Sequence, residues 1–121
     1  MARTILVVDD SPTDRAAIVE VVRSLGYQSL EAENAEQGLQ LAASRKPDLI
    51  LMDVVMPGAS GYEATRKIAK DPAYQSTPVI IISNRTKETD KLWGLRQGAQ
   101  AYLPKPVDPA ALGSAISKAL A

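Results

Sequence analysis

The sequence predicts an α/β fold, a doubly wound parallel sheet of five strands covered by five helices. Short runs rich in Val, Ile and Leu alternate along the chain with stretches of helical periodicity, which is the pattern of parallel strands buried on both faces. A length of 121 residues suffices for one domain with a sizeable core. We therefore expect a single domain over residues 1–121.

Four short apolar runs are the clearest strand signals: Ile5-Leu6-Val7-Val8, Leu49-Ile50-Leu51-Met52, Val79-Ile80-Ile81-Ile82 and Ala101-Tyr102-Leu103. Each run has the length of a strand and is too short for an ordinary helix. Residues 27–32 mix polar and apolar side chains, which is typical of a strand at the edge of a sheet. These segments account for the five predicted strands.

The first two helices are predicted by capping residues and apolar spacing. Ser11 is the expected N-cap of the first helix, with Pro12 in its first turn, and Gly26 is placed to end it. The face of this helix that we expect to be buried carries Ile18, Val21, Val22 and Leu25. Asn34 is the expected N-cap of the second helix, whose inward face carries Ala35, Leu39 and Ala42.

The remaining three helices follow the same logic. The third comes after the turn-forming segment 56–61 and is broken by Asp71-Pro72. The fourth is expected over residues 87–97, and Asp108 followed by Pro109 predicts the start of the fifth. Strands and helices therefore alternate strictly from the first strand to the last helix.

Composition excludes several classes of protein. The 14 Lys and Arg residues balance the 14 Asp and Glu residues, so no basic surface is expected to attract nucleic acid. The chain has no Cys and no His, which excludes disulfide scaffolds, thiolate or imidazole zinc sites and His-dependent triads. Residues 1–4 show no signal-peptide pattern, and no apolar stretch approaches the roughly 20 residues of a membrane span. We expect a cytoplasmic protein.

Polar side chains that carry chemistry follow the strands. Asp9 and Asp10 come after the first run, Asp53 after the third strand, Ser83 after the fourth, and Lys105 just past the fifth. Because the carboxyl ends of parallel strands meet at one edge of the sheet, these groups are expected to lie near one another. Three acids, a hydroxyl and an amine at one edge suit a hard cation and a phosphoryl group.

The acids also favour one strand order. In the order 2-1-3-4-5, strands one and three are neighbours and Asp10 lies beside Asp53. A Rossmann-type order would place strand two between them. The turn at residues 9–14 has neither G-x-G-x-x-G nor G-K-[ST], which argues against a dinucleotide or P-loop site there.

A divalent cation is the expected partner of the acids. Carboxylates in contact raise one another's pKa unless a cation lies between them, and Mg²⁺ takes oxygen ligands of this kind. We expect Asp10 and Asp53 as direct ligands, Asp9 as an outer ligand through water, and the backbone carbonyl of Val55 as a further ligand. Mn²⁺ is an alternative. The competing interpretation, in which Asp9 and Asp10 only cap a helix, is weakened because Ser11 already supplies the cap.

Asp53 has a second possible role as a nucleophile, since a carboxylate can accept a phosphoryl group. Lys105 then supplies an ammonium for the phosphoryl oxygens, held between Pro104 and Pro106, and Ser83 supplies a hydroxyl. Taken singly, Lys105 could be a surface lysine and Ser83 a turn residue. Their convergence on one edge favours the functional interpretation.

These residues give the chain its resemblance to the response-regulator receiver domains of the CheY type. The resemblance rests on Asp9-Asp10, on Asp53 followed by Met56-Pro57 and Gly61, on Ser83, and on Tyr102 three residues before Lys105-Pro106. It implies a flavodoxin/CheY-like sheet and Mg²⁺-dependent phosphoryl transfer to Asp53 from a partner histidine kinase of the CheA kind. It also implies that the chain is no enzyme beyond catalysing its own phosphorylation and dephosphorylation.

The resemblance further implies a conformational switch. On phosphorylation, Ser83 is expected to move toward the phosphoryl group and Tyr102 to turn inward. The surface of the fourth helix, fifth strand and fifth helix would then change its preference for a downstream protein. Segments 88–99, 102–107 and 53–58 resemble the twitching-motility (PilH-like) branch, which implies chemotaxis-like control of type IV pilus movement or of phototaxis.

Some residues depart from the common receiver pattern. Val55 is apolar where many members are polar, Asn84 replaces a small residue, and Arg85 adds a long cation, so we expect these three to tune hydrolysis of the phosphoryl group. Trp93 on the fourth helix is either a packing residue or a partner contact. We expect no output domain after the last helix, so the effect would pass through another protein.

Three alternatives compete with the switch interpretation, and the first of them fails at a named residue. A haloacid-dehalogenase-like phosphatase would need a second acid two residues after the nucleophile, and Val55 occupies that position. A receiver-shaped scaffold that never becomes phosphorylated is the second. The third is a phosphate sink that drains a sister regulator.

Overall fold

Five parallel strands form the central sheet of the computed structural model, which describes residues 2–56, 60–74 and 77–121. The strands are β1 (Thr4–Val8), β2 (Gln28–Ala32), β3 (Leu49–Met52), β4 (Val79–Ser83) and β5 (Ala101–Pro104). Their order in the sheet is β2-β1-β3-β4-β5, and every pairing is parallel. The predicted fold class and strand order are therefore confirmed.

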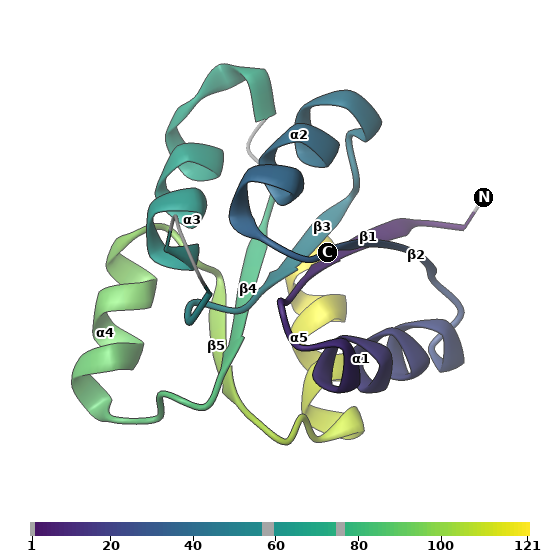
Figure 1. Cartoon of the computed structure of the whole chain (residues 1–121). Helices are drawn as coiled ribbons and strands as arrows, with labels where there is room; N and C mark the ends of the chain where they lie inside the picture. The colour runs from purple at the N-terminus through teal and green to yellow at the C-terminus, as the bar shows by residue number, and fades with distance from the viewer. Residues whose placement is uncertain (1, 57–59, 75–76) are drawn as a thin grey trace.

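Helices cover both faces of this sheet (Figure 1). Within the described residues they are α1 (Pro12–Ser24), α2 (Ala35–Arg45), α3 (Gly61–Lys70), α4 (Glu88–Arg96) and α5 (Pro109–Leu120), and a 3₁₀ turn, η1 (Pro72–Tyr74), follows α3. Helices α1 and α5 pack on one face, and α2 and α3 pack on the other. Helix α4 lies beside α3, on the same side of the sheet (Figure 1).

The helix termini follow the capping signals in the sequence. The side chains of Ser11, Asn34 and Asp108 each accept a hydrogen bond from the backbone amide three residues on, at 3.3, 2.8 and 3.3 Å. Gly26 and Gly98, which follow α1 and α4, have φ angles of 92° and 108°. Because side chains disfavour this backbone region, glycine is the residue that lets the chain leave these two helices.

Alternating residues of the central strands feed two cores. The first core packs against α1 and α5 and contains Ile5, Val7, Leu49, Leu51, Ile80 and Ile82. The second packs against α2 and α3 and contains Leu6, Val8, Ile50, Met52 and Val79. Because both faces of these strands are covered, the strands are continuous apolar runs, and the polar groups that follow each run lie at the sheet edge.

One predicted core residue is exposed. Leu25 was expected on the buried face of α1, but 41% of its surface is accessible. The helix ends at Ser24, and Leu25 occupies the cap position, where it lies against Gly113 of α5. The buried face of α1 therefore ends at Val22. Helical spacing does not place Leu25, because the helix has ended at Ser24 and the chain turns at Gly26.

Two further points concern the predicted elements. Residues 57–59 of the predicted loop, which include Pro57, lie outside the described residues. Within the described part of the chain, no helix combines the length and the apolar character that a membrane crossing requires.

Candidate functional site

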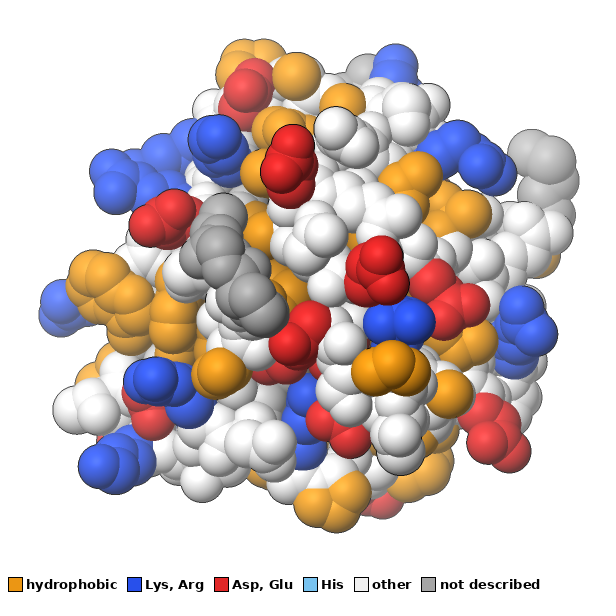
Figure 2. All heavy atoms as spheres, in the orientation of Figure 1, with side chains coloured by type: hydrophobic (Ala, Val, Ile, Leu, Met, Phe, Trp, Pro, Cys, Tyr) orange, Lys and Arg blue, Asp and Glu red, His pale blue; other side chains and the backbone are white. Residues whose placement is uncertain are grey.

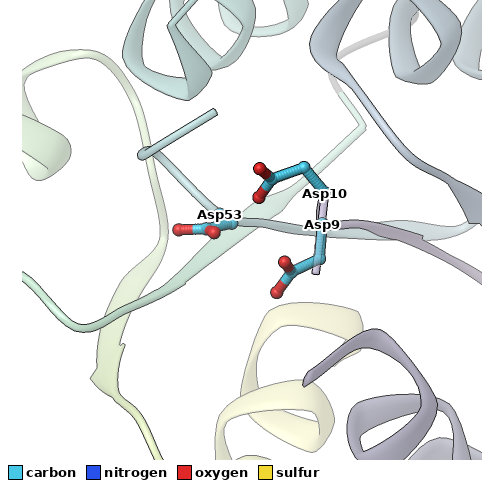
Figure 3. A group of neighbouring side chains, drawn as sticks. All are labelled: Asp9, Asp10 and Asp53. Atoms are coloured by element: carbon cyan, nitrogen blue, oxygen red, sulfur yellow. The ribbon is translucent and has the colours of Figure 1, made fainter. Parts of the chain in front are cut away.

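Three carboxylates meet where β1 and β3 end. Asp9 and Asp10 follow β1, and Asp53 follows the neighbouring strand β3 (Figure 3). One carboxylate oxygen from each residue lies within 4.8 Å of the others. Asp9 and Asp53 are buried, whereas Asp10 is exposed to solvent. The sequence prediction that these acids would lie together is borne out by the pairing of β1 with β3, in which Val8 lies opposite Met52.

Lys105 bonds to this cluster from the end of β5. Its ammonium donates to Asp9 at 2.8 Å, to Asp14 at 2.9 Å and to Asp53 at 3.3 Å, so each of its three hydrogens has a carboxylate partner. The side chain of Lys105 is only 7% exposed. The backbone amide of Lys105 also donates to the carbonyl of Ser83 at 3.0 Å, which ties the end of β5 to the end of β4.

The electrostatics of the site follow from this crowding. Burial raises the pKa of the Asp53 carboxyl, and the Val55 amide and the Lys105 ammonium oppose this without cancelling it. Burial alone would lower the pKa of Lys105, but hydrogen bonds to Asp9 and Asp14 outweigh it and raise the pKa. Lys105 therefore stays charged at neutral pH, and the carboxylates around it still outnumber it.

The donor set fits a hard divalent cation. Every group in the acid cluster is a carboxylate oxygen, and the cluster carries more negative charge than one ammonium neutralises. Both oxygens of Asp9 already have partners, because Oδ1 accepts from the Ser11 amide at 2.9 Å and Oδ2 accepts from Lys105. Asp10 is exposed, and its carboxylate faces the cluster from the solvent side.

Ser83 lies at the end of β4 and is fully buried. Its hydroxyl oxygen accepts a hydrogen bond from the Arg85 amide at 3.1 Å. This bond uses the oxygen and leaves the hydroxyl hydrogen for another acceptor. The structure thus places Ser83 at the predicted edge, with its oxygen directed to the loop that follows β4.

Tyr102 lies inward, half-buried between β5 and α4. Its hydroxyl donates to the carbonyl of Arg85 at 2.7 Å and lies 3.3 Å from the hydroxyl of Tyr62. The ring of Tyr102 therefore packs on α4 in this structure, and its inward turn on phosphorylation stays a prediction.

The three residues predicted to tune hydrolysis lie in two different settings. Val55 is 49% exposed, and its amide donates to Asp53 Oδ1 at 3.2 Å. Asn84 and Arg85 are exposed in the loop after β4. The guanidinium of Arg85 lies 3.8 Å from the carboxylate of Asp90 on α4, so it is paired with that helix.

Two residues of the site were missed by the sequence analysis. Asp14, in the first turn of α1, was not assigned to the site from the sequence, yet it binds Lys105. The signal that could have found it is its place in that first turn, because a helix that follows β1 begins at the edge where Asp9 and Asp10 lie. Tyr62 was not singled out from the sequence either, and no local pattern indicates that it reaches Tyr102.

Comparison with known proteins agrees with this geometry. The family model of the response regulator receiver domain matches residues 5–117. The chain belongs to the response regulator receiver domain family. This receiver is 50% identical to the protein PilH of Pseudomonas aeruginosa, over all of this chain and 99% of PilH. The predicted resemblance to the PilH-like branch is therefore confirmed.

Other relatives are longer than this chain. The receiver is 38% identical over 120 residues to the phosphate regulon transcriptional regulatory protein PhoB of P. aeruginosa and covers 52% of it. It is 32% identical over 118 residues to the sensor histidine kinase CheAY of Helicobacter pylori and covers 15% of it. The chain thus spans about half the length of one relative and a small part of the other.

Solved structures show the same fold. The chemotaxis protein CheY4 of Vibrio cholerae superposes with a TM-score of 0.90 at 28% identity, covering 99% of this chain and 100% of CheY4. The receiver domain of the sensor histidine kinase PA1611 of P. aeruginosa superposes with a TM-score of 0.89 at 30% identity, covering 99% and 98% of the two chains. The PA1611 structure holds a magnesium ion in its active site cleft.

Proposed function

We propose that this receiver is a phosphorylated switch in a two-component relay. In this proposal Asp53 accepts a phosphoryl group from a histidine kinase of the CheA kind. The face formed by α4, β5 and α5 then changes its affinity for a downstream protein. The observation that carries the proposal is that the buried carboxylate of Asp53 is within reach of an ammonium and of two further acids.

The proposed transfer uses groups that are already in place. A carboxylate oxygen of Asp53 forms a bond to phosphorus while the bond between phosphorus and the donor's imidazole nitrogen breaks, and the electron pair returns to that nitrogen. The chain contains no His, so the donor imidazole lies outside these 121 residues. Lys105 would balance charge on the phosphoryl oxygens, and the hydrogen of the Ser83 hydroxyl would donate to one of them.

A divalent cation completes the proposed site. Asp10, Asp53 and the carbonyl of Val55 would hold Mg²⁺ directly, and Asp9 would act through water. Mn²⁺ would suit the same oxygen donors. When bound, the cation supplies positive charge that offsets the crowded acids and the phosphoryl oxygens.

The switch interpretation is preferred over turnover catalysis for a structural reason. A phosphatase that uses an aspartate nucleophile needs a proton donor for the leaving group, and the residue two positions after Asp53 is Val55, whose exposed side chain cannot donate. The domain would therefore act on its own phosphoryl group alone.

The proposed output face carries apolar side chains in contact with solvent. On α4, Leu92, Trp93 and Leu95 are 53, 52 and 46% exposed. Figure 2 shows hydrophobic side chains gathered at the edge of the molecule where Figure 1 places α4. Trp93 is thus a surface residue, which supports the partner-contact interpretation over the packing one. Similarity to PilH supports an output in type IV pilus movement, and phototaxis or another chemotaxis-like pathway is the alternative.

The test is phosphorylation by a small donor. The chain is incubated with acetyl phosphate and Mg²⁺, and intact-mass spectrometry measures the number of phosphoryl groups added. We expect one labile group on the wild type and none on Asp53→Asn, with Asp71→Asn, an exposed acid after α3, behaving as the wild type. An adduct of equal size on Asp53→Asn would contradict the proposal. No adduct with any donor would indicate a scaffold, and rapid multiple turnover would indicate a phosphatase.

A further inference from the structure

Tyr62, in the first turn of α3, contacts the residue to which the switch is assigned. Its hydroxyl lies 3.3 Å from the hydroxyl of Tyr102 and 3.4 Å from the carbonyl of Asp90 on α4. We propose that Tyr62 is a positioning residue that holds Tyr102 inward and thereby links the start of α3 to β5. This role rests on the proposed function, because it gives Tyr62 a part in the same switch.

The direction of the hydrogen bonds follows from counting protons. Each tyrosine has one hydroxyl hydrogen, and that of Tyr102 is used in the 2.7 Å bond to the carbonyl of Arg85. Any hydrogen shared between the two tyrosines must therefore come from Tyr62, whose single hydroxyl hydrogen has two acceptors within reach, the Tyr102 hydroxyl at 3.3 Å and the carbonyl of Asp90 at 3.4 Å. The resulting chain runs from Tyr62 through Tyr102 to Arg85, and bonds in series of this kind strengthen one another.

Packing fixes the ring of Tyr102 on its other side. A Cβ atom added at Gly94 of α4 would lie 2.7 Å from Cδ2 of Tyr102 and 2.9 Å from Cδ1 of Ile81. The ring thus lies directly against the backbone of α4, above a small core formed by Val54, Ile81 and Ala99. The hydroxyl group is the only part of the Tyr102 ring that can form hydrogen bonds, and the hydroxyl of Tyr62 lies beside it.

Tyr62 is also connected to the phosphoacceptor strand. A side chain at Gly61 would overlap the backbone carbonyl of Asp53 and would lie 2.6 Å from Cα of Val54. The start of α3 therefore rests against the backbone of Asp53, and Tyr62 is the next residue. A displacement of the Asp53 backbone would therefore move Gly61 and Tyr62, and Tyr62 contacts Tyr102.

Ser83 and Tyr102 both form hydrogen bonds with the backbone of Arg85, in the loop after β4. The amide of Arg85 donates to the Ser83 hydroxyl at 3.1 Å, and the carbonyl of Arg85 accepts from Tyr102. The loop after β4 is thus held from both sides, by Ser83 on the site side and by the tyrosine pair on the α3 side. Tyr62, through Tyr102, would therefore act on the same loop that Ser83 holds.

Burial supports the donor role of Tyr62. Desolvation, followed by the hydrogen bond with Tyr102, raises the pKa of the Tyr62 hydroxyl above its ordinary value. The hydroxyl therefore keeps its proton throughout the neutral range. Because Phe has the same ring without the hydroxyl, Tyr62→Phe removes the proposed interaction and keeps the packing.

The experiment observes the Tyr102 ring directly. The chain is labelled with carbon-13 at the tyrosine rings, and the signals of its four tyrosines, Tyr27, Tyr62, Tyr74 and Tyr102, are assigned by Tyr→Phe variants. In Tyr62→Phe we expect the population of the outward Tyr102 ring to rise about fivefold, the effect of losing one hydrogen bond of about 1 kcal/mol. Tyr74→Phe, a half-buried tyrosine in the other core, is the matched control and should leave the Tyr102 signal unchanged.

Gly94→Ala provides a reference for the outward ring. The methyl group added in Gly94→Ala would push the ring of Tyr102 away from α4 while Tyr62 is intact. The Tyr102 signal of this variant therefore marks the outward position, in which the ring no longer packs on α4. A Tyr62→Phe spectrum in which Tyr102 remains at its wild-type position would overturn the inference. A shift toward the Gly94→Ala position supports it.

A second measurement separates this inference from the proposed function. Acetyl phosphate and Mg²⁺ are added to the wild type and to Tyr62→Phe, and the Tyr102 signal and the intact mass are recorded together. If the wild type is never modified, the proposed function fails, and the ring result still decides the positioning role. If both proteins are modified and their Tyr102 signals respond identically, the proposed function stands and the inference is overturned. Modification of both proteins with Tyr102 signals that respond differently supports both.

Discussion

Lys105 makes ion pairs of two different kinds. Its bonds to Asp9 and Asp53 are almost inaccessible to water, since these carboxylates are 1% and 7% exposed, whereas the carboxylate of Asp14 is 41% exposed. Removing one member of a buried pair leaves an uncompensated charge, which costs far more than losing an exposed pair. The two kinds of pair should therefore respond differently to substitution.

The first prediction compares these pairs. Lys105→Met leaves Asp9 and Asp53 without their cation and is expected to lower the free energy of unfolding by roughly 3 kcal/mol at neutral pH. Asp14→Asn is expected to cost less than about 1 kcal/mol, since solvent screens that pair. Urea denaturation of the three proteins without divalent cations measures both values. Equal losses in the two variants would show that the burial of the pairs does not decide their strength.

The second prediction concerns Asp53 itself. Because burial raises its pKa above the unfolded value, the folded state binds this proton more tightly, and stability falls as pH rises from the ordinary carboxyl range through the raised pKa. Asp53→Asn does not pay this cost. We expect the variant to unfold at higher urea concentration than the wild type at pH 7 without divalent cations, and the two midpoints to converge toward pH 4.

The convergence is the decisive part of that measurement. A difference that stayed constant from pH 4 to pH 7 would assign the effect to packing of the amide instead of to the carboxylate charge. Asp71→Asn, at an exposed position, should show no such pH-dependent difference.

At the scale of the elements, helix docking depends on small residues at contact points. A Cβ atom at Gly38 of α2 would lie 2.9 and 3.1 Å from the methyl groups of Val8, so α2 rests directly on β1. A Cβ at Gly113 of α5 would lie 3.4 Å from Leu25, which is an ordinary contact distance. The two glycines have the same helical backbone, and only the space beside them differs.

The third prediction uses this pair of glycines. Gly113→Ala is expected to raise the free energy of unfolding by roughly 0.5–1 kcal/mol, since alanine favours the helix and has room. Gly38→Ala gains the same propensity but overpacks β1, which costs about 1–3 kcal/mol, so its net effect is destabilising. Urea denaturation of both variants is the measurement. Stabilisation by Gly38→Ala would mean that α2 moves away from Val8 at little cost.

At the scale of the whole molecule, the helices packed on the two faces of the sheet support the acid cluster at the carboxyl ends of β1 and β3. The α1/α5 layer and the α2/α3 layer bury both faces of the strands, so the carboxyl ends of β1 and β3 are rigid supports for the acids. Ligands that bind such an edge stabilise the entire fold, because the site exists only when the layers are assembled.

The fourth prediction follows from this linkage. Mg²⁺ at about 100 times its dissociation constant is expected to stabilise the wild type by about 2.7 kcal/mol, which corresponds to roughly 10 °C in Tm for a domain of this size. Asp10→Asn, whose exposed side chain contributes little to the fold itself, should keep the Tm of the cation-free protein and lose most of the increase. Thermal scans with and without Mg²⁺ test this. An Asp10→Asn variant that gained the full increase would remove Asp10 from the proposed ligands.

The buried strands and the N-cap residues of the helices could be predicted from the sequence. The runs that end before Asp9, Asp53 and Ser83 identify buried strands, and the capping residues Ser11 and Asn34 are confirmed. The strand order also followed from local information, since only neighbouring strands can bring Asp10 and Asp53 together. The prediction that Leu25 is buried was wrong, because periodicity alone does not show at which residue a helix ends.

The sequence by itself determined the sheet, the edge at which the acids gather and the family to which the chain belongs, because strand periodicity and strand ends are local properties. Only the tertiary structure decided that Asp14 binds Lys105 and that Tyr62 reaches Tyr102. Those contacts join α1 and α3 to β5 across the molecule. Their distances depend on how the helical layers dock on the sheet, and the local sequence indicates at most the edge of the sheet near which a residue such as Asp14 lies.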